Sequence, residues 1–406
     1  YRAGSAQTTG LKMVAIGANA LYQGTAQNFM TAVGHSAGYS HTGTEGVLIG
    51  SDAGYSSGAS HGAVHVGRQA GYNATGNDNV SVGRFAMFSA SSSNTGANNI
   101  AMGRSALYGL SSGHRNIAIG YAALDAADTE SDNIAIGYDA LGGAVAGGEK
   151  NVAIGNYAGD AVTSGDGSVL VGHNAGTAVT TGNYNTLVGY EAGAQISTGY
   201  ANVAIGRQAN RYGNGNDSIA IGFGSLSNAD LAGDRNIGIG YNAGNSITSG
   251  DGNVVIGNAN VASATGDNQL SISSNSASSP VTWITGTSTG AVSFPNNQAG
   301  NAVAAASTAN NDYLTLLEVP HGTYKAIKAT VHITDSTNNE VQTMDVMAHY
   351  DGSAANFTEY GIIFDGAAAI GSVEADVNGS NLRLRFKNEQ GGTATLAASI
   401  HAVLLA

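Results

Sequence analysis

Cysteine is absent from this 406-residue chain, and proline and charged residues are scarce. Without Cys, the chain cannot form disulfides, use a thiol nucleophile or bind zinc through thiolates. Only 3 residues are Pro and 11% are charged, but 60 Gly and 42% hydrophobic residues without a Gly-X-Y period exclude collagen-like and disordered chains. There is no apolar run of about 18 residues and no signal peptide, so membrane insertion is not expected.

Positive charge is also in short supply. The net charge of −13 argues against a nucleic-acid partner, because phosphate binding needs a clustered positive surface.

The chain begins at Tyr1 rather than Met, which predicts a fragment or a processed product.

A nine-residue pattern dominates the first two-thirds of the chain. In Asn151–Gly159 it reads Asn-Val-Ala-Ile-Gly-Asn-Tyr-Ala-Gly, and its first glycine, called the repeat glycine below, occurs in fifteen copies. The spacing is 16 to 18 residues, with one interval of 20. A period this regular predicts a repeat architecture. The repeat glycines are Gly17, Gly34, Gly50, Gly67, Gly83, Gly103, Gly120, Gly137, Gly155, Gly172, Gly189, Gly206, Gly222, Gly240 and Gly257.

The residues before each repeat glycine have the alternation of a β-strand. The residue three before it is β-branched in all fifteen copies, and the residue one before it is Ile or Val except at Met102. A mostly small residue lies between them. This period of two predicts one short strand per copy, with its β-branched side chains on the inner face and a tight corner at the glycine.

The residues after the repeat glycine predict a thin coil. Ala lies three residues after it in thirteen copies, which predicts a second, shorter strand, and the rest of the copy has turn composition. We expect a parallel β-roll or β-solenoid of about fifteen coils, roughly 70 Å long at a strand spacing of ~4.8 Å. Such a roll buries little surface, so lateral association of several rolls is expected.

Asn precedes the strand in nine copies and is expected to stack as an amide ladder along one corner. These residues are Asn79, Asn99, Asn116, Asn133, Asn151, Asn185, Asn202, Asn236 and Asn253.

The segments NVAIGNYAG (151–159), NIAIGYDAL (133–141) and NTLVGYEAG (185–193) resemble the repeats of bacteriophage tail fibres, particularly those of marine and cyanobacterial viruses. They are also similar to the head repeats of bacterial trimeric autotransporter adhesins, which form trimeric parallel β-rolls. The likeness covers about 250 residues, with a longer period than in the adhesin heads. This resemblance implies a homotrimer, a location in the virion, and a virion tail or adaptor protein as a partner.

The pattern stops after Gly257, and all three Pro and the only Trp lie beyond it. We expect a shaft over 1–267, a neck and linker over 268–311 with a small linker at 302–306, and an antiparallel β-sandwich or jelly roll over 312–406. Asn378-Gly379 is a hairpin signal. This last domain resembles the C-terminal domains of cyanophage virion structural proteins. Its expected strands are Tyr313–Val319, Tyr324–Ile333, Val341–Tyr350, Thr358–Phe364, Val373–Val377, Leu382–Phe386 and Thr393–Leu405.

Two sets of side chains recur at fixed places in consecutive copies. Five residues after the repeat glycine lie Tyr39, Tyr55, Tyr72, Phe88 and Tyr108. They form either a strip for host glycans or an aromatic ladder that stiffens the roll, and the ladder is favoured. One residue after the glycine lie Arg68, Arg84 and Arg104. Stacked like charges need a counterpart, which is an anionic polysaccharide, acids of a neighbouring chain or solvent.

Three residues are candidate metal ligands. His65 lies between the two β-branched strand positions, so three copies around a threefold axis would ring a metal or an anion; a hydrogen-bonded or solvated imidazole is the default. Asp166 and Asp251 lie between glycines in matching turns and could bind calcium. Turn formation is favoured for both, because one carboxylate per loop is poor for a cation that takes six or more oxygens. No cofactor is expected.

The sequence has no nucleophile elbow, metalloprotease motif, phosphate loop or convincing pair of carboxylates, so an enzyme is not expected. The leading hypothesis is a structural and adhesive virion fibre that presents a host-binding tip on a rigid shaft. It would bind a host cell-surface glycan or protein with multivalent avidity. The alternatives are a bacterial surface adhesin or self-assembling secreted filament, located outside the cell or on its surface, and a polysaccharide-degrading fibre enzyme.

Overall fold

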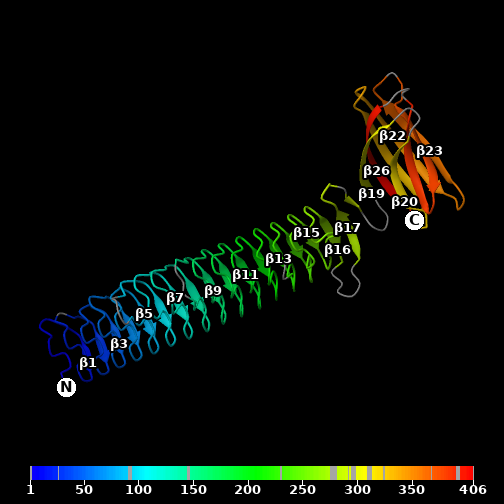
Figure 1. The fold of residues 1–406 in the computed structure, drawn as a ribbon. Helices are drawn as coiled ribbons and strands as arrows, with labels where there is room; N and C mark the ends of the chain where they lie inside the picture. Colours follow the sequence, from blue (N-terminus) through cyan, green and yellow to red (C-terminus); the bar gives the residue numbers. More distant parts are fainter. Residues whose placement is uncertain are drawn as a thin grey trace. The chain divides into compact units, whose positions relative to one another are not determined.

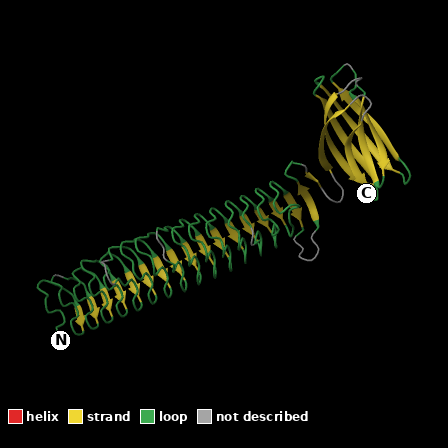
Figure 2. Cartoon of the chain, viewed as in Figure 1, coloured by secondary structure: helices red, strands yellow, loops and turns green. Residues whose placement is uncertain are grey.

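The computed structural model divides into two compact units, Tyr1–Asp267 and Asn268–Ala406, and its described residues contain strands and turns but no helix. Figure 1 and Figure 2 show stacked coils in the first unit and antiparallel strands in the second. The structure describes residues 2–25, 27–89, 94–143, 147–228, 231–274, 281–290, 292–293, 299–308, 313–322, 325–366, 368–389 and 394–405.

The first unit is a parallel β-solenoid, as the repeat predicted, and each coil contributes one three-residue strand. Strand β9 (Val152–Ile154) pairs in parallel with the coils on both sides, with Val152 opposite Ile134 and Val169. The other strands are β1 (Val14–Ile16), β2 (Thr31–Val33), β3 (Val47–Ile49), β4 (Val64–Val66), β5 (Val80–Val82), β6 (Ile100–Met102), β7 (Ile117–Ile119), β8 (Ile134–Ile136), β10 (Val169–Val171), β11 (Thr186–Val188), β12 (Val203–Ile205), β13 (Ile219–Ile221), β14 (Ile237–Ile239) and β15 (Val254–Ile256).

Glycine is required at the repeat-glycine position because the backbone has a positive φ and because the next coil approaches too closely for a Cβ. Gly155 has φ 134°, and a Cβ there would lie 2.4 Å from the carbonyl oxygen of Gly172 in the next coil. Two residues later Tyr157 has φ 59°, and Gly159 has φ 62°. This succession of left-handed residues forms a turn in place of the second, shorter strand that was expected after the glycine. The described coils therefore contain one strand each.

The inner face of the sheet carries the middle residue of each three-residue strand, which is mostly small. The prediction of a β-branched inner face was therefore wrong. In β9, Ala153 is fully buried whereas Ile154 is 38% exposed. Alternation separates the two faces of a strand but does not say which face is inside, and β-branched residues suit a strand on either face. The thin coil has room for one inward side chain per strand, most often Ala, so the branched residues on either side of it lie outside.

The volumes of neighbouring inward positions compensate one another. Leu170 fills its coil, and the left-handed position that follows is Gly176, whose added Cβ would lie 2.8 Å from Leu170 and 3.0 Å from Leu187. In an earlier coil the strand residue is Ala135 and the left-handed position is Leu141, which is buried. The split between Gly and larger apolar residues in the sequence thus records which of two positions fills the interior.

The predicted asparagine column is buried along one corner, but most of its hydrogen bonds run to the main chain of the adjacent coils. Asn133 Nδ2 donates to the Gly148 carbonyl at 3.0 Å, and its Oδ1 accepts the Asn151 N–H at 2.9 Å. The N–H of Asn133 itself is bonded to Asn116 Oδ1 at 3.0 Å. The side-chain amide of Asn133 therefore bonds to the following coil and its main-chain N–H to the preceding one, so three consecutive coils are joined and none of these buried groups lacks a partner.

The second unit begins with the antiparallel strands β16 (Leu270–Ser273), β17 (Thr282–Gly286) and β18 (Val292–Ser293). A five-stranded sheet, in the order β19-β26-β21-β22-β23, and a three-stranded sheet, β20-β25-β24, then share one apolar core. Their strands are β19 (Ala299–Thr308), β20 (Tyr313–Pro320), β21 (Ala326–Asp335), β22 (Glu340–Tyr350), β23 (Ala355–Phe364), β24 (Gly371–Asn378), β25 (Asn381–Asn388) and β26 (Ala394–Leu405).

The seven strands expected in the C-terminal domain are present, and Asn378 begins the predicted hairpin opposite Asn381. Tyr324 and Thr393, where two of them were expected to start, lie outside the described residues. The small linker expected at 302–306 was wrong. These residues lie within β19, which pairs along its whole length with β26. A run of Ala carries little strand signal, and pairing with a neighbouring strand overrides it.

The asparagine column predicts a graded effect on stability. Asn133→Ala leaves two buried main-chain groups without partners, which costs about 2–4 kcal/mol in total. Asn133→Ser should cost less, because Ser168 occupies the equivalent position and its hydroxyl accepts the Asn185 N–H at 3.1 Å. Thermal unfolding should rank wild type above Ser and Ser above Ala, with exposed Gln195→Ala unchanged. Equal melting of the Ala and Ser variants would contradict this role.

Candidate functional site

The outer face of the parallel sheet is a continuous apolar row. Its side chains lie one residue before the repeat glycine; nine of the fifteen are exposed, from 36% at Ile119 to 59% at Ile16, and the other six are half-buried. Fifteen strands at ~4.8 Å, each about 10 Å long, give a face on the order of 700 Å². Apolar patches of this size on soluble proteins mark contact surfaces. The most exposed members are Ile16, Ile49, Met102, Ile119, Ile154, Ile205, Ile221, Ile239 and Ile256.

The five aromatic residues predicted as a column form a stacked ladder. Tyr39 and Tyr55 have ring centroids 4.9 Å apart and are 4° from parallel, and Tyr55 and Tyr72 are 5.1 Å apart at 6°. Phe88 and Tyr108 continue the stack at 5.3 Å. A sugar stacks on the face of an aromatic ring, and these faces are covered by neighbouring rings. The geometry therefore favours the stiffening ladder over the glycan strip.

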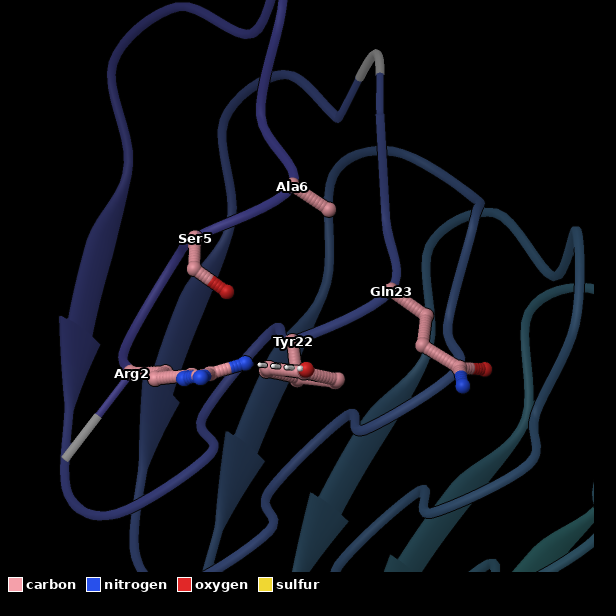
Figure 3. Close-up of a pocket in the computed structure, with 5 residues that line it drawn as sticks. All are labelled: Arg2, Ser5, Ala6, Tyr22 and Gln23. Atoms are coloured by element: carbon pink, nitrogen blue, oxygen red, sulfur yellow. Dashed lines mark hydrogen bonds between the residues drawn. The ribbon is translucent and has the colours of Figure 1, made fainter.

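One further ring belongs to the ladder and was not predicted. Tyr22 stacks on Tyr39 at 5.2 Å, and its hydroxyl accepts a hydrogen bond from Arg2 Nη1 at 3.1 Å. Tyr22 lines an open hollow together with Arg2, Ser5, Ala6 and Gln23, shown in Figure 3. Tyr22 lies five residues after Gly17, so reading the same position one copy earlier would have found it.

The predicted arginines lie in an exposed corner column, defined as the residues one after each repeat glycine. Arg84 Cζ lies 4.6 Å from the ring centroid of Phe85, and Arg68 Cζ lies 5.8 Å from the same ring. Arg104 Cζ lies 5.5 Å from the ring of Tyr121, the next member of the column. Stacking on aromatic rings thus holds these like charges beside one another.

The rest of the corner column is largely aromatic. Tyr121 and Tyr138 stack at 5.0 Å and 9°, and four further pairings follow along the column. They are His173 with Tyr190 at 5.5 Å, Phe223 with Tyr241 at 5.2 Å, and Arg207 over both Tyr190 and Phe223.

Charge pairing distinguishes the predicted arginines from two exposed arginines at another corner of the solenoid. Arg115 forms a bidentate pair with Asp132, and Arg235 Nη2 lies 3.5 Å from Asp251. Among the described residues, no carboxylate forms an ion pair with Arg68, Arg84 or Arg104. Their guanidinium groups are exposed and retain N–H donors for a ligand.

His65 does not lie on a face that another chain could share. It is fully buried inside its own coil, with Nδ1 2.7 Å from Ser81 Oγ, so the proposed ring of three His65 side chains around an axis is wrong. The residue occupies the small inward position, which places it in the interior. His41, which was not predicted, is buried nearby with Nδ1 2.7 Å from Ser57 Oγ.

The two buried histidines are neutral at physiological pH. Ser57 donates its only hydroxyl proton to Gly54, so His41 Nδ1 must be the donor in its bond with Ser57. Nε2 of His41 and Nε2 of His65 have no hydrogen-bond partner among the described residues. Burial lowers the pKa of His65 to about 3, with help from His41, and lowers the pKa of His41 to about 4, with help from His61.

Asp166 and Asp251 have the turn role that the sequence favoured. Asp166 Oδ1 accepts the Glu149 N–H, and Asp251 Oδ1 accepts the Asp234 N–H, both at 2.8 Å. These bonds join adjacent coils at one corner. Within the part of the chain that the structure describes, no group of three or more His, Asp or Glu side chains is placed to hold a metal ion.

Carboxylates follow the aromatic ladder further along the solenoid. Asp125 occupies the ladder position after Tyr108, and its pKa is raised to about 6 by burial and by repulsion from Asp139 and Asp160. Burial also raises the pKa of Asp139 and of Asp160. The three side chains make this part of the surface acidic, in contrast to the corner that carries the arginines.

In the second unit, β23 is an edge strand with apolar side chains on both faces. Consecutive residues of a strand point to opposite faces, yet Ile362 is 43% exposed and Ile363 is 72% exposed. Phe357, Tyr360 and Phe364 are each at least 40% exposed. An apolar edge of this kind is a candidate contact surface, because both of its faces expose apolar side chains and its outer main-chain edge has no neighbouring strand in the sheet.

Comparison with known protein families and with curated protein sequences finds no match for this chain. The described residues include no helix long and apolar enough to cross a membrane.

The buried histidines predict acid destabilisation of the early coils. Both have a folded-state pKa below the unfolded value of 6.5, so unfolding takes up protons and stability falls as the pH drops below 6.5 towards 3–4. The slope is about 1.4 kcal/mol per pH unit for each histidine in that window, and there is no contribution above it.

The measurement is the melting temperature between pH 4 and pH 7. The double variant His41→Leu/His65→Leu should lose less stability on acidification than wild type, because Leu is already buried at the position of His65 in Leu48 and Leu170 and at the position of His41 in Leu110. The control His35→Gln alters an exposed histidine and should follow wild type. A double variant with the wild-type pH dependence would rule out the buried histidines as the cause.

Proposed function

We propose that this protein is a structural and adhesive fibre of the bacteriophage tail-fibre type. The solenoid is the rigid shaft, and the C-terminal antiparallel domain is the tip that contacts a host cell-surface glycan or protein. The role is mechanical rather than catalytic. A virion tail or adaptor protein holds the other end. Support comes from the repeat segments, which resemble those of such fibres, and from the stacked coils that they form.

The observation that carries the proposal is the apolar outer row, whose partner in the fibre would be the same row of two further copies. Its area, on the order of 700 Å², is close to the ~800 Å² that each partner contributes to a standard protein interface. The side chains repeat in every coil, so three identical rolls can align them along their whole length. A homotrimer also gives the fibre three tips and therefore avidity.

Within the tip, strand β23 is the surface that we assign to host binding. Its exposed Phe357, Tyr360 and Phe364 are residue types that concentrate binding energy at interfaces. The main-chain edge of the same strand adds donors and acceptors for an extended partner segment.

Oligomeric mass tests the shaft. Wild type should have the mass of three chains by light scattering and by native mass spectrometry. Ile154→Asp/Ile221→Asp places charges in the outer row and should give monomers that retain the β-sheet circular dichroism signal. The control Tyr184→Asp alters a side chain that is 67% exposed at another corner, and it should remain trimeric. A monomeric wild-type protein would refute the trimer.

Immunolabelling separates the phage fibre from the runner-up, a bacterial adhesin or extracellular filament. An antibody raised against the solenoid should label the tails of virions in electron micrographs of an infected culture. Labelling of bacterial surfaces or of free filaments in uninfected cultures would favour the runner-up.

A further inference from the structure

We propose that the corner column at Arg68, Arg84 and Arg104 is a binding track for an acidic polysaccharide, with one anionic group bound per coil. This inference deepens the proposed adhesive function by assigning a ligand class to the shaft. The anionic ligand was one of three open explanations for these arginines in the sequence. The structure supplies reasons to prefer it.

The guanidinium groups are held in place from below. Phe85 lies under Arg84 and Arg68, and its ring meets that of Phe88 edge-on at 5.5 Å. Phe88 belongs to the aromatic ladder, so the packed ladder fixes Phe85 and Phe85 orients the arginines. A guanidinium stacked on a ring uses its face and leaves its in-plane N–H groups free to bind carboxylate or sulfate.

Main-chain hydrogen bonds fix the spacing of the track. Phe85 N–H donates to the Arg68 carbonyl at 3.0 Å, and Ser105 N–H donates to the Arg84 carbonyl at 3.1 Å. The strands beneath are paired in register, so the three arginines follow one another at a strand spacing of ~4.8 Å. A polyanion that presents its charged groups at a similar spacing would place one anionic group at each arginine.

The charges around the track favour an external anion over an internal one. The cations at a different corner, Arg115 and Arg235, are matched with carboxylates of the next coil, whereas no described carboxylate pairs with the track. The three arginines therefore have no ion-pair partner among the described carboxylates, although the chain carries a net charge of −13. Unpaired neighbouring cations repel each other, and a bound polyanion removes that repulsion.

The neighbouring aromatics favour a polysaccharide over a single-stranded nucleic acid. Nucleic-acid strands bind such grooves by stacking bases on free aromatic faces. Tyr121 and Tyr138 extend the column, but they stack on each other at 5.0 Å and present their edges and hydroxyls. Hydroxyl edges suit the hydroxyl groups of sugars. The overall negative charge also opposes the long phosphate backbone.

The test compares two triple variants with the same loss of charge. Arg68→Gln/Arg84→Gln/Arg104→Gln removes the track. Arg115→Gln/Lys150→Gln/Arg235→Gln removes three exposed cations that belong to another corner and lie near carboxylates. Binding of the full chain to immobilised alginate is measured at several salt concentrations, with dextran as the neutral probe and single-stranded DNA as a second polyanion.

Wild type should bind alginate in a salt-sensitive manner and should not bind dextran. The track variant should lose about tenfold or more in affinity, and the control variant should stay within about twofold of wild type. Phe85→Leu keeps the charge but loses the stacking, and it should bind about threefold more weakly. Equal losses in the two triple variants, equal binding to DNA, or no alginate binding by wild type would each overturn the proposal.

Oligomeric mass, measured on the same samples, keeps this inference separate from the proposed fibre. If the track variant falls apart into monomers while the control variant does not, the arginines bind a neighbouring chain and the polysaccharide track is wrong. If wild type is a monomer that still binds alginate through the track, the trimeric shaft fails and the binding site stands.

Discussion

The hydrogen bonding of each coil to the next, in register, is the constraint on which the rest of the solenoid depends. Val152 can only lie opposite Ile134 and Val169, so every position of the repeat has its own counterparts as neighbours one coil away. The close approach of the coils also excludes a side chain at the corner, where a Cβ on Gly155 would meet the Gly172 carbonyl. A residue is therefore tolerated at a position of the repeat only if its side chain can pack against the residue at the equivalent position of the next coil, whether that residue is identical or different.

The chemistry of the columns follows from this rule. Asn suits a buried column because its amide both donates to and accepts from the main chain of the following coil. Tyrosine suits a half-buried column because its rings stack at about the spacing of the coils. A charged side chain, by contrast, is repelled by the same side chain in the next coil. The arginines are compatible with the stack because aromatic residues such as Phe85 and Tyr121 lie under the guanidinium groups.

The repeat sequence was sufficient to predict the parallel solenoid, the strand before each repeat glycine, the asparagine corner and the aromatic ladder, because each depends only on which residues recur. It could not say which face of the strand is inside. That choice depends on the width of the coil, which a period of two does not contain, so Ile154 was placed inside and His65 outside. The strand β19 was missed for a related reason, since its place depends on pairing with β26, nearly 100 residues later.

The inverted placement of the faces changes what the exposed surface can do. With the branched residues outside, the solenoid has an apolar face that water does not favour and a corner of oriented cations that no described carboxylate neutralises. The two surfaces make opposite demands: an apolar row is stabilised by excluding water and ions, whereas a row of cations needs an anion to reach it. In the proposed fibre the two surfaces would coexist on opposite sides of the repeat glycine, since the outward residue of the strand precedes it and the corner residue follows it. The same glycine that closes each coil would therefore also allow the proposed assembly and the proposed recognition to be altered independently.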